Sequence, residues 1–294
     1  MFYAPLYAAV SKGFFEAEGL KVEIETGGGS DKSMTALLAG EADVALMGPE
    51  TVVYVANQGK EDCPVVVAQL TKRDGSFLMS REDEGADFEW ENLRGKSVIG
   101  GRRGGMPLMT LEYVLKNHGL IPGKDVEVID DVQFNLMAGA FEGGTGDYVT
   151  LFEPTATNME KAGKGFVVAN VGTESGEVPY TALMVTPEMI SEKPELVEDF
   201  VRAVYNAQKW VQTATDNEIA TAIEPFFPDT DIESLEVVAR SYRETDSWMQ
   251  TPVMTADSYE RLLDIVESAG ELSARPDMSL VVDNSFAEKV TDGE

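Results

Sequence analysis

Cysteine, histidine and basic residues are scarce in this chain. Of its 294 residues, one is cysteine, one is histidine and 23 are lysine or arginine, against 52 aspartates and glutamates. A single cysteine excludes an internal disulfide, and together with a single histidine it excludes a cysteine- or histidine-rich metal site. The formal net charge of −29 repels phosphate backbones and anionic lipid surfaces. We therefore expect no metal ion and no nucleic-acid partner.

Long apolar runs and cofactor motifs are absent as well. No stretch approaches the ~20 apolar residues that span a bilayer, and Met1-Phe2-Tyr3 lacks the basic start of a signal peptide. Gly95-Lys96-Ser97 resembles the end of a phosphate-binding loop, but Trp90 stands where the first glycine is required. We expect a soluble segment without a signal sequence and without a cofactor. Cys63 is expected to be a buried thiol, and His118 to be structural at a helix end.

Apolar runs of strand length alternate with amphipathic runs of helix length along the first two thirds of the chain. This alternation is typical of an α/β protein with a mainly parallel sheet. From about Lys193 strands become scarce and helices follow one another. The predicted strands are 22–25, 42–47, 65–70, 97–100, 126–129, 148–152 and 166–169. The predicted helices are 5–18, a helix around 34–38, one from about 49, 106–118, 134–141, 154–162, 195–213, 234–242 and 256–268.

Two strand-to-helix cycles of roughly 80–100 residues each indicate two lobes. We place the first lobe at residues 1–76 and 183–294 and the second at residues 77–182. The chain would cross between them at Phe77-Leu78-Met79 and at Leu183-Met184-Val185. The C-terminal helices are expected to pack on one lobe. Two crossings make a hinge with a cleft between the lobes, and such clefts are favoured ligand sites.

The few basic residues gather at strand ends. Lys72-Arg73 follows the strand that ends at Leu70, and Arg102-Arg103 follows the strand that ends at Gly100. Ligands bind outside the carboxyl ends of strands in open α/β sheets, and a helix start after Gly104-Gly105 would attract an anion. These residues favour an anionic or polar ligand. Solubilising loop residues that balance nearby acids are the alternative interpretation.

Other turns stand out by position. Gly48-Pro49-Glu50-Thr51 and Phe152-Glu153-Pro154 join strands to helices, and Pro179-Tyr180-Thr181 leads into the second crossing. Tyr3 and Tyr7 flank the start of the first helix, where their rings could stack on a flat ligand. For each residue alone, core packing or helix capping is as good an interpretation. Together they describe one cleft lined from both lobes.

Several motifs, in this order, resemble one protein family. The segments are 4–9, 12–15, 18–23, 38–45, 93–98 and 282–287. They resemble the solute-binding proteins of ABC importers of the nitrate/sulfonate/taurine and thiamine-pyrimidine-precursor type. The resemblance implies a two-lobed periplasmic-binding-protein type II fold with a hinge of two crossover segments and a helical C-terminal part. It implies a monomer, not an enzyme, that closes on one small molecule and delivers it to a membrane permease with its ATPase.

The resemblance also implies an extracytoplasmic location, in the periplasm or lipid-anchored at the outer face of the membrane. The ligand would be a sulfonate, nitrate, taurine or a pyrimidine-like molecule, held by loops that match the turns above. Lys72 and Arg73 are added for their position. The predicted ligand-binding residues are Tyr3, Pro5, Tyr7, Gly48, Glu50, Thr51, Lys72, Arg73, Arg103, Gly104, Gly105, Met106, Glu153, Pro179, Tyr180 and Thr181.

The chain departs from the family in two ways. The family has a short strand before the first helix, and here the chain begins at Met1, so that strand is expected to precede the numbered segment. An enzymatic branch that makes the thiamine pyrimidine carries a cysteine cluster, which Cys63 alone cannot supply. An enzyme acting on a pyrimidine or small acid, with Glu153 as acid–base group, stays an alternative, as does a ligand sensor domain. The basic pairs favour an anion, whereas the aromatic residues and Glu153 fit a heterocycle with N–H donors equally well.

Overall fold

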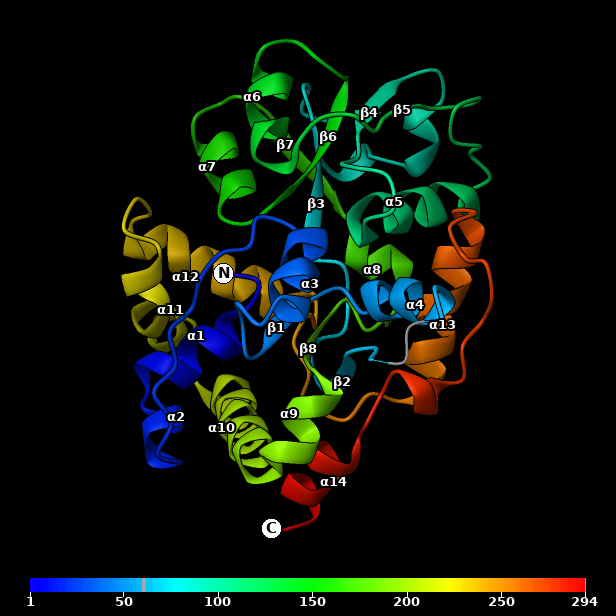
Figure 1. Ribbon diagram of the computed structural model, residues 1–294. Helices are drawn as coiled ribbons and strands as arrows, with labels where there is room; N and C mark the ends of the chain where they lie inside the picture. Colours follow the sequence, from blue (N-terminus) through cyan, green and yellow to red (C-terminus); the bar gives the residue numbers. More distant parts are fainter. Residues whose placement is uncertain (60–61, 294) are drawn as a thin grey trace.

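The computed structural model describes residues 1–59 and 62–293, and its strands form two separate sheets (Figure 1). One sheet has three strands in the order β1-β8-β2, and the other has five in the order β5-β4-β6-β3-β7. Helices surround both sheets, so the predicted α/β class is confirmed. The strands are β1 Ala45–Met47, β2 Val65–Thr71, β3 Ser76–Ser80, β4 Ser97–Ile99, β5 Glu127–Ile129, β6 Tyr148–Phe152, β7 Phe166–Asn170 and β8 Thr181–Val185.

The expectation of a mainly parallel sheet is wrong. Strand β4 runs parallel to β5 and β6, but β3 is antiparallel to β6 and β7. In the three-stranded sheet β8 lies between β1 and β2 and is antiparallel to both. A run of apolar residues indicates that a strand is buried on both faces. This burial does not depend on whether the strand runs parallel or antiparallel to its neighbours. Strand direction was therefore not readable from the hydrophobic pattern.

Two predicted elements near the start of the chain differ from the structure. Residues 22–25 alternate apolar and acidic side chains, but they form no strand, and no described strand pairs with them. A strand needs a hydrogen-bonded neighbour, which alternation alone does not supply. The predicted helix 5–18 is two helices, α1 Ala4–Ser11 and α2 Phe14–Ala17. Gly13 separates them with a φ of 74°, a left-handed conformation that interrupts the helix.

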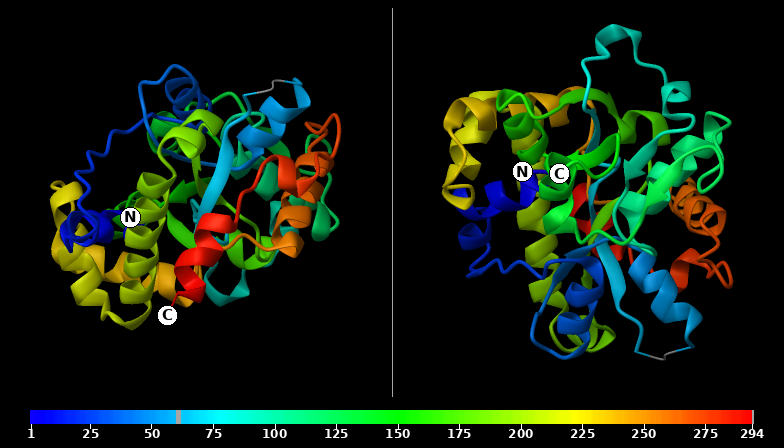
Figure 2. Two further views of the ribbon diagram at one scale, coloured as in Figure 1. Left: turned by 60° about the horizontal axis from the view of Figure 1, so that its bottom comes forward. Right: turned by 90° about the horizontal axis from the view of Figure 1, so that it is seen from above.

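Helix α10, which runs over Pro194–Thr213, covers the three-stranded sheet. It packs against β2, α1, α2 and α14, and Figure 2 (left) shows α10 and α14 side by side at this end of the molecule. Its buried face carries Val197, Val201 and Val204, at the spacing of one helical stripe. The other helices are α3 Ser30–Leu38, α4 Glu50–Asn57, α5 Met106–Asn117, α6 Met137–Glu142, α7 Thr155–Lys161, α8 Val171–Ser175, α9 Pro187–Glu192, α11 Asp216–Ile223, α12 Ile232–Glu244, α13 Ala256–Ser268 and α14 Ser285–Asp292.

The sequence predicts that the C-terminal helices pack on one lobe. In the structure they contact elements that belong to both sheets. Helix α13 packs against both α4 and α5, and α12 packs against both α11 and α7. Helix α13 buries Tyr259, Leu262, Leu263 and Val266, a face wide enough for two neighbours. These helices therefore link elements that carry the three-stranded sheet to elements that carry the five-stranded sheet. Within the described ranges no helix combines the length and apolar composition needed to cross a membrane.

The chain passes twice between the two sheets, and the two passages lie side by side. The Val178 N–H donates to the Lys72 carbonyl at 2.9 Å, and the Thr181 N–H donates to the Thr71 hydroxyl at 3.1 Å. The hydroxyl oxygens of Thr71 and Thr181 are 2.6 Å apart. A third segment joins them, because Lys72 also donates its N–H to Ser247 at 2.9 Å. The connection between the sheets is thus a small hydrogen-bonded junction of three segments.

Candidate functional site

An aromatic cluster lies where the two sheets approach each other, with Phe2 at its centre. The Phe2 ring centroid is 5.4 Å from that of Tyr3, 5.6 Å from Phe152, 5.6 Å from Tyr180 and 5.2 Å from Tyr242. These rings come from the chain start, the end of β6, the start of β8 and helix α12. The cluster therefore draws on elements of both sheets and on the C-terminal helices.

Tyr242 of α12 ties this cluster to both passages of the chain. Its hydroxyl accepts a hydrogen bond from the Glu153 N–H and donates one to the Gly75 carbonyl, each at 3.1 Å. Its side chain is fully buried. Gly75 has no room for a side chain, because a Cβ there would lie 2.5 Å from the Phe2 ring. One hydroxyl thus holds the end of β6 and the first passage together.

Replacement of Tyr242 by phenylalanine is expected to lower the free energy of unfolding by about 1–3 kcal/mol, because two buried backbone groups lose their partner. Denaturant unfolding monitored by far-ultraviolet circular dichroism measures this loss. Tyr113→Phe is the matched control, since the Tyr113 hydroxyl meets the exposed Arg261 at 3.4 Å, and we expect it to change stability by less than about 0.5 kcal/mol. Equal stabilities of the two variants would contradict the bridging role of Tyr242.

Glu50, the first residue of α4, is a buried carboxyl group in this region. Its residue is 1% exposed, and its Oε2 has no hydrogen-bond partner. Burial raises the pKa of Glu50 to about 8, although the backbone N–H groups of Glu50 and Met106 favour the charged form. Met106 is the first residue of α5, which follows strand β4 of the five-stranded sheet. The Glu50 carboxyl group therefore faces the N-terminus of α5. The predicted residues Glu50 and Met106 are thus brought together.

The turn before Glu50 is built around Gly48. A Cβ at Gly48 would lie 2.0 Å from Oε2 of Glu50, so the carboxyl group folds back over the glycine. The Gly48 N–H donates to the Ser30 hydroxyl at 3.2 Å, and the Thr51 hydroxyl donates to the Gly48 carbonyl at 2.7 Å. Gly48 therefore permits the position of the Glu50 carboxyl group, and Thr51 fixes the turn.

Two further contacts join this part of the chain to the loop before α5. The Tyr54 hydroxyl on α4 donates to the Gly104 carbonyl at 3.1 Å. The Arg102 guanidinium pairs with the Asp31 carboxylate on α3 at 3.0 Å. Gly104 and Met106, at the start of α5, therefore lie against α4. Arg102, which was not among the predicted ligand residues, makes an ion pair across this contact.

Asp74 and Tyr180 form a second buried polar group at the junction of the passages. Asp74 is 0% exposed, and its Oδ1 accepts the Ser76 N–H at 2.7 Å. Burial raises the pKa of Asp74 to about 6. The pKa of Tyr180 is raised by burial, then by the charge of Asp74 and a side-chain hydrogen bond to it, and then by Tyr3 and Glu50. Asp74 and Tyr180 therefore face each other, and Glu50 Oε2 is the carboxyl oxygen of this cluster that is left with unused hydrogen-bonding capacity.

Glu153, at the end of β6, is the third buried carboxyl group. It accepts hydrogen bonds from the Thr157 N–H and the Thr157 hydroxyl, both at 2.9 Å. Burial raises its pKa. Glu153 therefore has more hydrogen-bond partners than Glu50.

The predicted basic residues lie with acids outside this cluster. The ammonium of Lys72 is 2.8 Å from Asp246 Oδ2, and Arg73 is 3.8 Å from the same atom. Arg103 pairs with Asp130, and its side chain is 79% exposed. In the described part of the chain no lysine, arginine or histidine forms an ion pair with any of the three buried carboxyl groups. Lys72 and Arg103 thus have close acidic partners, whereas the Nε of Arg73 is buried and has no hydrogen-bond partner.

Some of the remaining predicted residues lie in the buried cluster, and others have partners outside it. Pro5 is buried within α1, and the Tyr7 ring packs on Phe226 and Phe227 at 4.6 and 5.4 Å. Thr181 uses its hydroxyl in the junction, next to the buried Pro179 and Tyr180. Tyr3, in contrast, lies in the aromatic cluster, and the charge of Glu50 is among the causes that raise its pKa, after burial and Tyr7.

Sequence reasoning missed Phe2, Asp74 and Tyr242. Asp74 follows Lys72-Arg73 at a strand end, and this position alone could have marked it as a candidate site residue. Tyr242 lies inside a predicted helix, where nothing local separates it from core tyrosines. Phe2 has no signal beyond its apolar ring. These side chains meet only because distant elements are packed together.

The single histidine, His118, and the single cysteine, Cys63, both contact neighbouring residues of the fold. The His118 ring stacks on Trp90 at a centroid distance of 5.4 Å, and its Nε2 is 2.9 Å from the Glu174 carboxylate. Cys63 is buried, as expected, with its sulfur 3.5 Å from the Val52 carbonyl. No group of three or more histidine, cysteine, aspartate or glutamate side chains suited to a metal ion occurs among the described residues.

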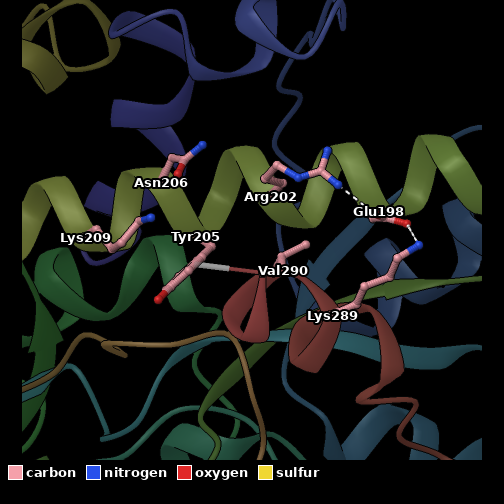
Figure 3. A pocket seen from close by; sticks show the side chains of 8 residues that line it. Glu198, Arg202, Tyr205, Asn206, Lys209, Lys289 and Val290 are labelled. Atoms are coloured by element: carbon pink, nitrogen blue, oxygen red, sulfur yellow. Dashed lines mark hydrogen bonds and ion pairs between the residues drawn. The ribbon is translucent and has the colours of Figure 1, made fainter.

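A groove of about 440 Å³ lies elsewhere, between α10 and α14 (Figure 3). Glu198 pairs there with Arg202 at 2.5 Å and with Lys289, and Lys209 lies over the Tyr205 ring at 4.4 Å. It is at the end of the molecule remote from the five-stranded sheet (Figure 1). Its charges are already paired with one another, so it is a weaker candidate than the cluster between the sheets.

Comparisons with known proteins give one family. The profile of the family described as NMT1/THI5 like matches residues 2–217. The chain is 44% identical over 291 residues to YtlA of Bacillus subtilis, which is named as a binding protein, covering 99% of this chain and 87% of YtlA. It is 23% identical over 220 residues to the 4-amino-5-hydroxymethyl-2-methylpyrimidine phosphate synthase of Aspergillus parasiticus, covering 71% of this chain and 63% of that enzyme.

Solved structures share the fold. The ligand-binding component of an ABC-type import system from Staphylococcus aureus superposes with a TM-score of 0.77 at 17% identity, covering 98% of this chain and 95% of that one. The alkanesulfonate-binding protein SsuA of Xanthomonas axonopodis pv. citri superposes with a TM-score of 0.73 at 14% identity, covering 96% and 95%. At these identities the similarity concerns the architecture of the chain.

Proposed function

This chain belongs to the NMT1/THI5-like family, and from that premise we propose that it is the extracytoplasmic solute-binding component of an ABC importer. The fold it shares with ligand-binding components of such systems supports this role. Its partners would be a membrane permease, with the ATPase of that permease, and one small molecule. The protein would act as a monomer at the outer face of the membrane or in the periplasm, and a lipid anchor would hold it there.

In this proposal the solute binds between the two sheets. The first lobe would comprise residues 1–76 and 183–294, and the second residues 77–182. The observation that carries the proposal is Glu50, a buried carboxyl group with an unpartnered oxygen, held at the contact between α4 and the start of α5. Natural proteins rarely leave a buried polar atom unpaired unless something else pairs with it. The proposed ligand-binding residues are Tyr3, Gly48, Glu50, Thr51, Asp74, Gly104, Gly105, Met106, Glu153, Pro179, Tyr180 and Thr181.

Binding and release would follow from a hinge at the three-segment junction. With the lobes apart, the solute reaches the cluster. When they close, contacts such as Tyr54 to Gly104 and Arg102 to Asp31 form across the gap and exclude water. The solute thereby loses its contact with solvent and is held by charge-assisted hydrogen bonds and aromatic faces. A hinge motion of this kind is the common closure of two-lobed binding proteins.

The proposal is tested by thermal unfolding against a solute panel of alkanesulfonates, taurine, nitrate, small carboxylates and aminopyrimidines. A solute at about 100 times its Kd adds about 2.7 kcal/mol of stability and raises the Tm by a few degrees. Gly48→Ala is expected to weaken binding of any hit about tenfold or more, because the new methyl group displaces the Glu50 carboxyl group.

Gly139→Ala is the matched control, since a Cβ at Gly139 meets nothing within 4 Å. It should bind the hit as the unaltered protein does. Equal affinity of the Gly48→Ala variant would contradict a site between the sheets. Conversion of a bound solute to product, lost in Glu153→Gln, would replace the transport proposal by the enzymatic alternative.

A further inference from the structure

The three buried carboxyl groups of the cluster lack a cationic partner. Glu50 and Asp74 are 1% and 0% exposed; Glu50 Oε2 has no hydrogen bond, and Asp74 faces only the uncharged side chains of Ser76 and Tyr180. Glu153 is 7% exposed and near them, through its link to Tyr242. Buried charges in proteins are ordinarily paired, because an unpaired ion loses its hydration without compensation. Raised pKa values show the same cost, because Glu50 keeps its proton up to about pH 8; a positive group that binds beside these acids would let them ionise.

The basic side chains of this region do not supply that positive group. Lys72 is paired with Asp246, Arg102 with Asp31 and Arg103 with Asp130. Arg73 is 3.8 Å from Asp246 and keeps a buried Nε without a partner, but it forms no ion pair with Glu50, Asp74 or Glu153 among the described residues. A metal ion is a poor fit as well, because the described residues offer no group of three suitable ligands. The missing positive charge must therefore come from an organic molecule.

We infer that the site between the two sheets takes a small organic cation with N–H donors, such as a protonated amine or amidine. This inference rests on the proposed solute-binding function and names the class of the solute. The cation donates a hydrogen bond to the free Oε2 of Glu50 and pairs with the carboxylate of Asp74. Tyr3, Tyr180 and Phe152 belong to the aromatic cluster of this region, and aromatic rings attract cations.

Two other features of the protein agree with a cationic solute. The chain carries a net charge of −29, so its electric field raises the local concentration of cations and repels anions. Burial raises the pKa values of Glu50 and Asp74, to about 8 and about 6, against the hydrogen bonds that favour their charged forms. A bound cation would oppose that effect, and the carboxyl groups would release protons as it binds.

Two probes with the same ring and opposite charge test the inference. Benzamidinium is a flat cation with N–H donors, and benzenesulfonate is the matching anion. We expect calorimetric titration of the full chain to detect saturable binding of benzamidinium and none of benzenesulfonate. We expect benzamidinium affinity to rise as the pH is raised from about 6 to about 8.5, with protons released to the buffer.

Glu50→Gln, which keeps the shape of the side chain and removes its charge, should weaken benzamidinium binding about tenfold or more, and Asp74→Asn should act in the same direction. Glu41→Gln is the control, because Glu41 is an exposed carboxylate before β1, and it should leave the affinity unchanged. Circular dichroism shows whether each variant folds. If either Glu50→Gln or Asp74→Asn does not fold, the other variant still tests the inference.

Binding of benzenesulfonate that strengthens as the pH is lowered would overturn the inference, because protonated carboxyl groups would then be donors to an anion. Equal affinity of Glu50→Gln, Asp74→Asn and the unaltered protein for benzamidinium would overturn it as well. In both cases a saturable solute that Gly48→Ala weakens leaves the solute-binding function standing. If no solute of either panel binds, the proposed function fails, and the inference fails with it.

Discussion

Replacement of Gly172 by alanine is expected to lower the free energy of unfolding by about 3 kcal/mol. Gly172 lies in α8, packed against the first passage between the sheets. A Cβ at this position would lie 2.0 Å from the Asp74 carbonyl oxygen and 3.0 Å from the Cβ of Arg73. The nearest atom belongs to the backbone, so no side-chain rotation relieves the overlap. Either α8 or the passage must move.

Denaturant unfolding measures this effect as a lower midpoint at an unchanged slope. Gly139→Ala is again the matched control, because it adds the same methyl group to a helix where nothing lies within 4 Å. That variant should be as stable as the unaltered protein or more stable by up to about 1 kcal/mol, since alanine favours a helix over glycine. Equal stability of Gly172→Ala and Gly139→Ala would show that the passage does not pack as described.

Glu50→Gln is expected to make the protein more stable at alkaline pH and to leave it nearly unchanged in acid. Burial raises the pKa of Glu50 to about 8 from an ordinary value of 4.5. Between these values the folded protein holds a proton that the unfolded chain has released. Stability therefore falls as the pH rises from about 4.5 to about 8 and levels off above that range. Glutamine has no proton to release, so the variant loses this slope.

Each pKa unit corresponds to about 1.4 kcal/mol, so the variant should gain up to several kcal/mol at about pH 8.5 relative to the unaltered protein. Chemical unfolding between about pH 5 and pH 8.5, without added solute, measures the difference. Asp74, with a pKa raised to about 6, adds a slope of the same sign from its ordinary 3.8 upward, which Asp74→Asn should remove. The exposed Glu41→Gln should keep the slope of the unaltered protein. A Glu50→Gln curve parallel to that of the unaltered protein would mean that the carboxyl group is solvated.

Most elements of the fold were readable from local signals. Residues 256–268 were predicted as a helix and form α13 with the same bounds, because its apolar face repeats at helical spacing. The strand predicted at 148–152 is β6. The break at Gly13 and the unpaired segment 22–25 were not readable. One depends on a left-handed φ at one glycine, and the other on the presence of a neighbouring strand.

The candidate site was readable in part, for a definable reason. Gly48, Glu50 and Met106 were predicted from their positions at strand ends and helix starts, and the structure brings them together; their contact with a ligand stays a prediction. Asp74 and Tyr242 were not found, since their importance comes from contacts with residues such as Gly75 and Glu153. The acidic neighbours of Lys72, Arg73 and Arg103 could not be read from the sequence, because no local pattern announces them; whether these basic residues contact the ligand stays a prediction.

The composition, the periodicities and the family motifs of this chain were enough for its class, most of its helices and strands, and the turns that reach the site. Those properties depend on residues within a few positions of one another. Strand direction, the hydrogen-bonded junction of the passages and the pairing of each charge were decided by tertiary structure. They depend on groups such as Lys72 and Asp246 that are far apart in sequence and meet only when the chain is folded. The cluster of buried acids without a cation belongs to this second group, since burial is a property of the packed molecule.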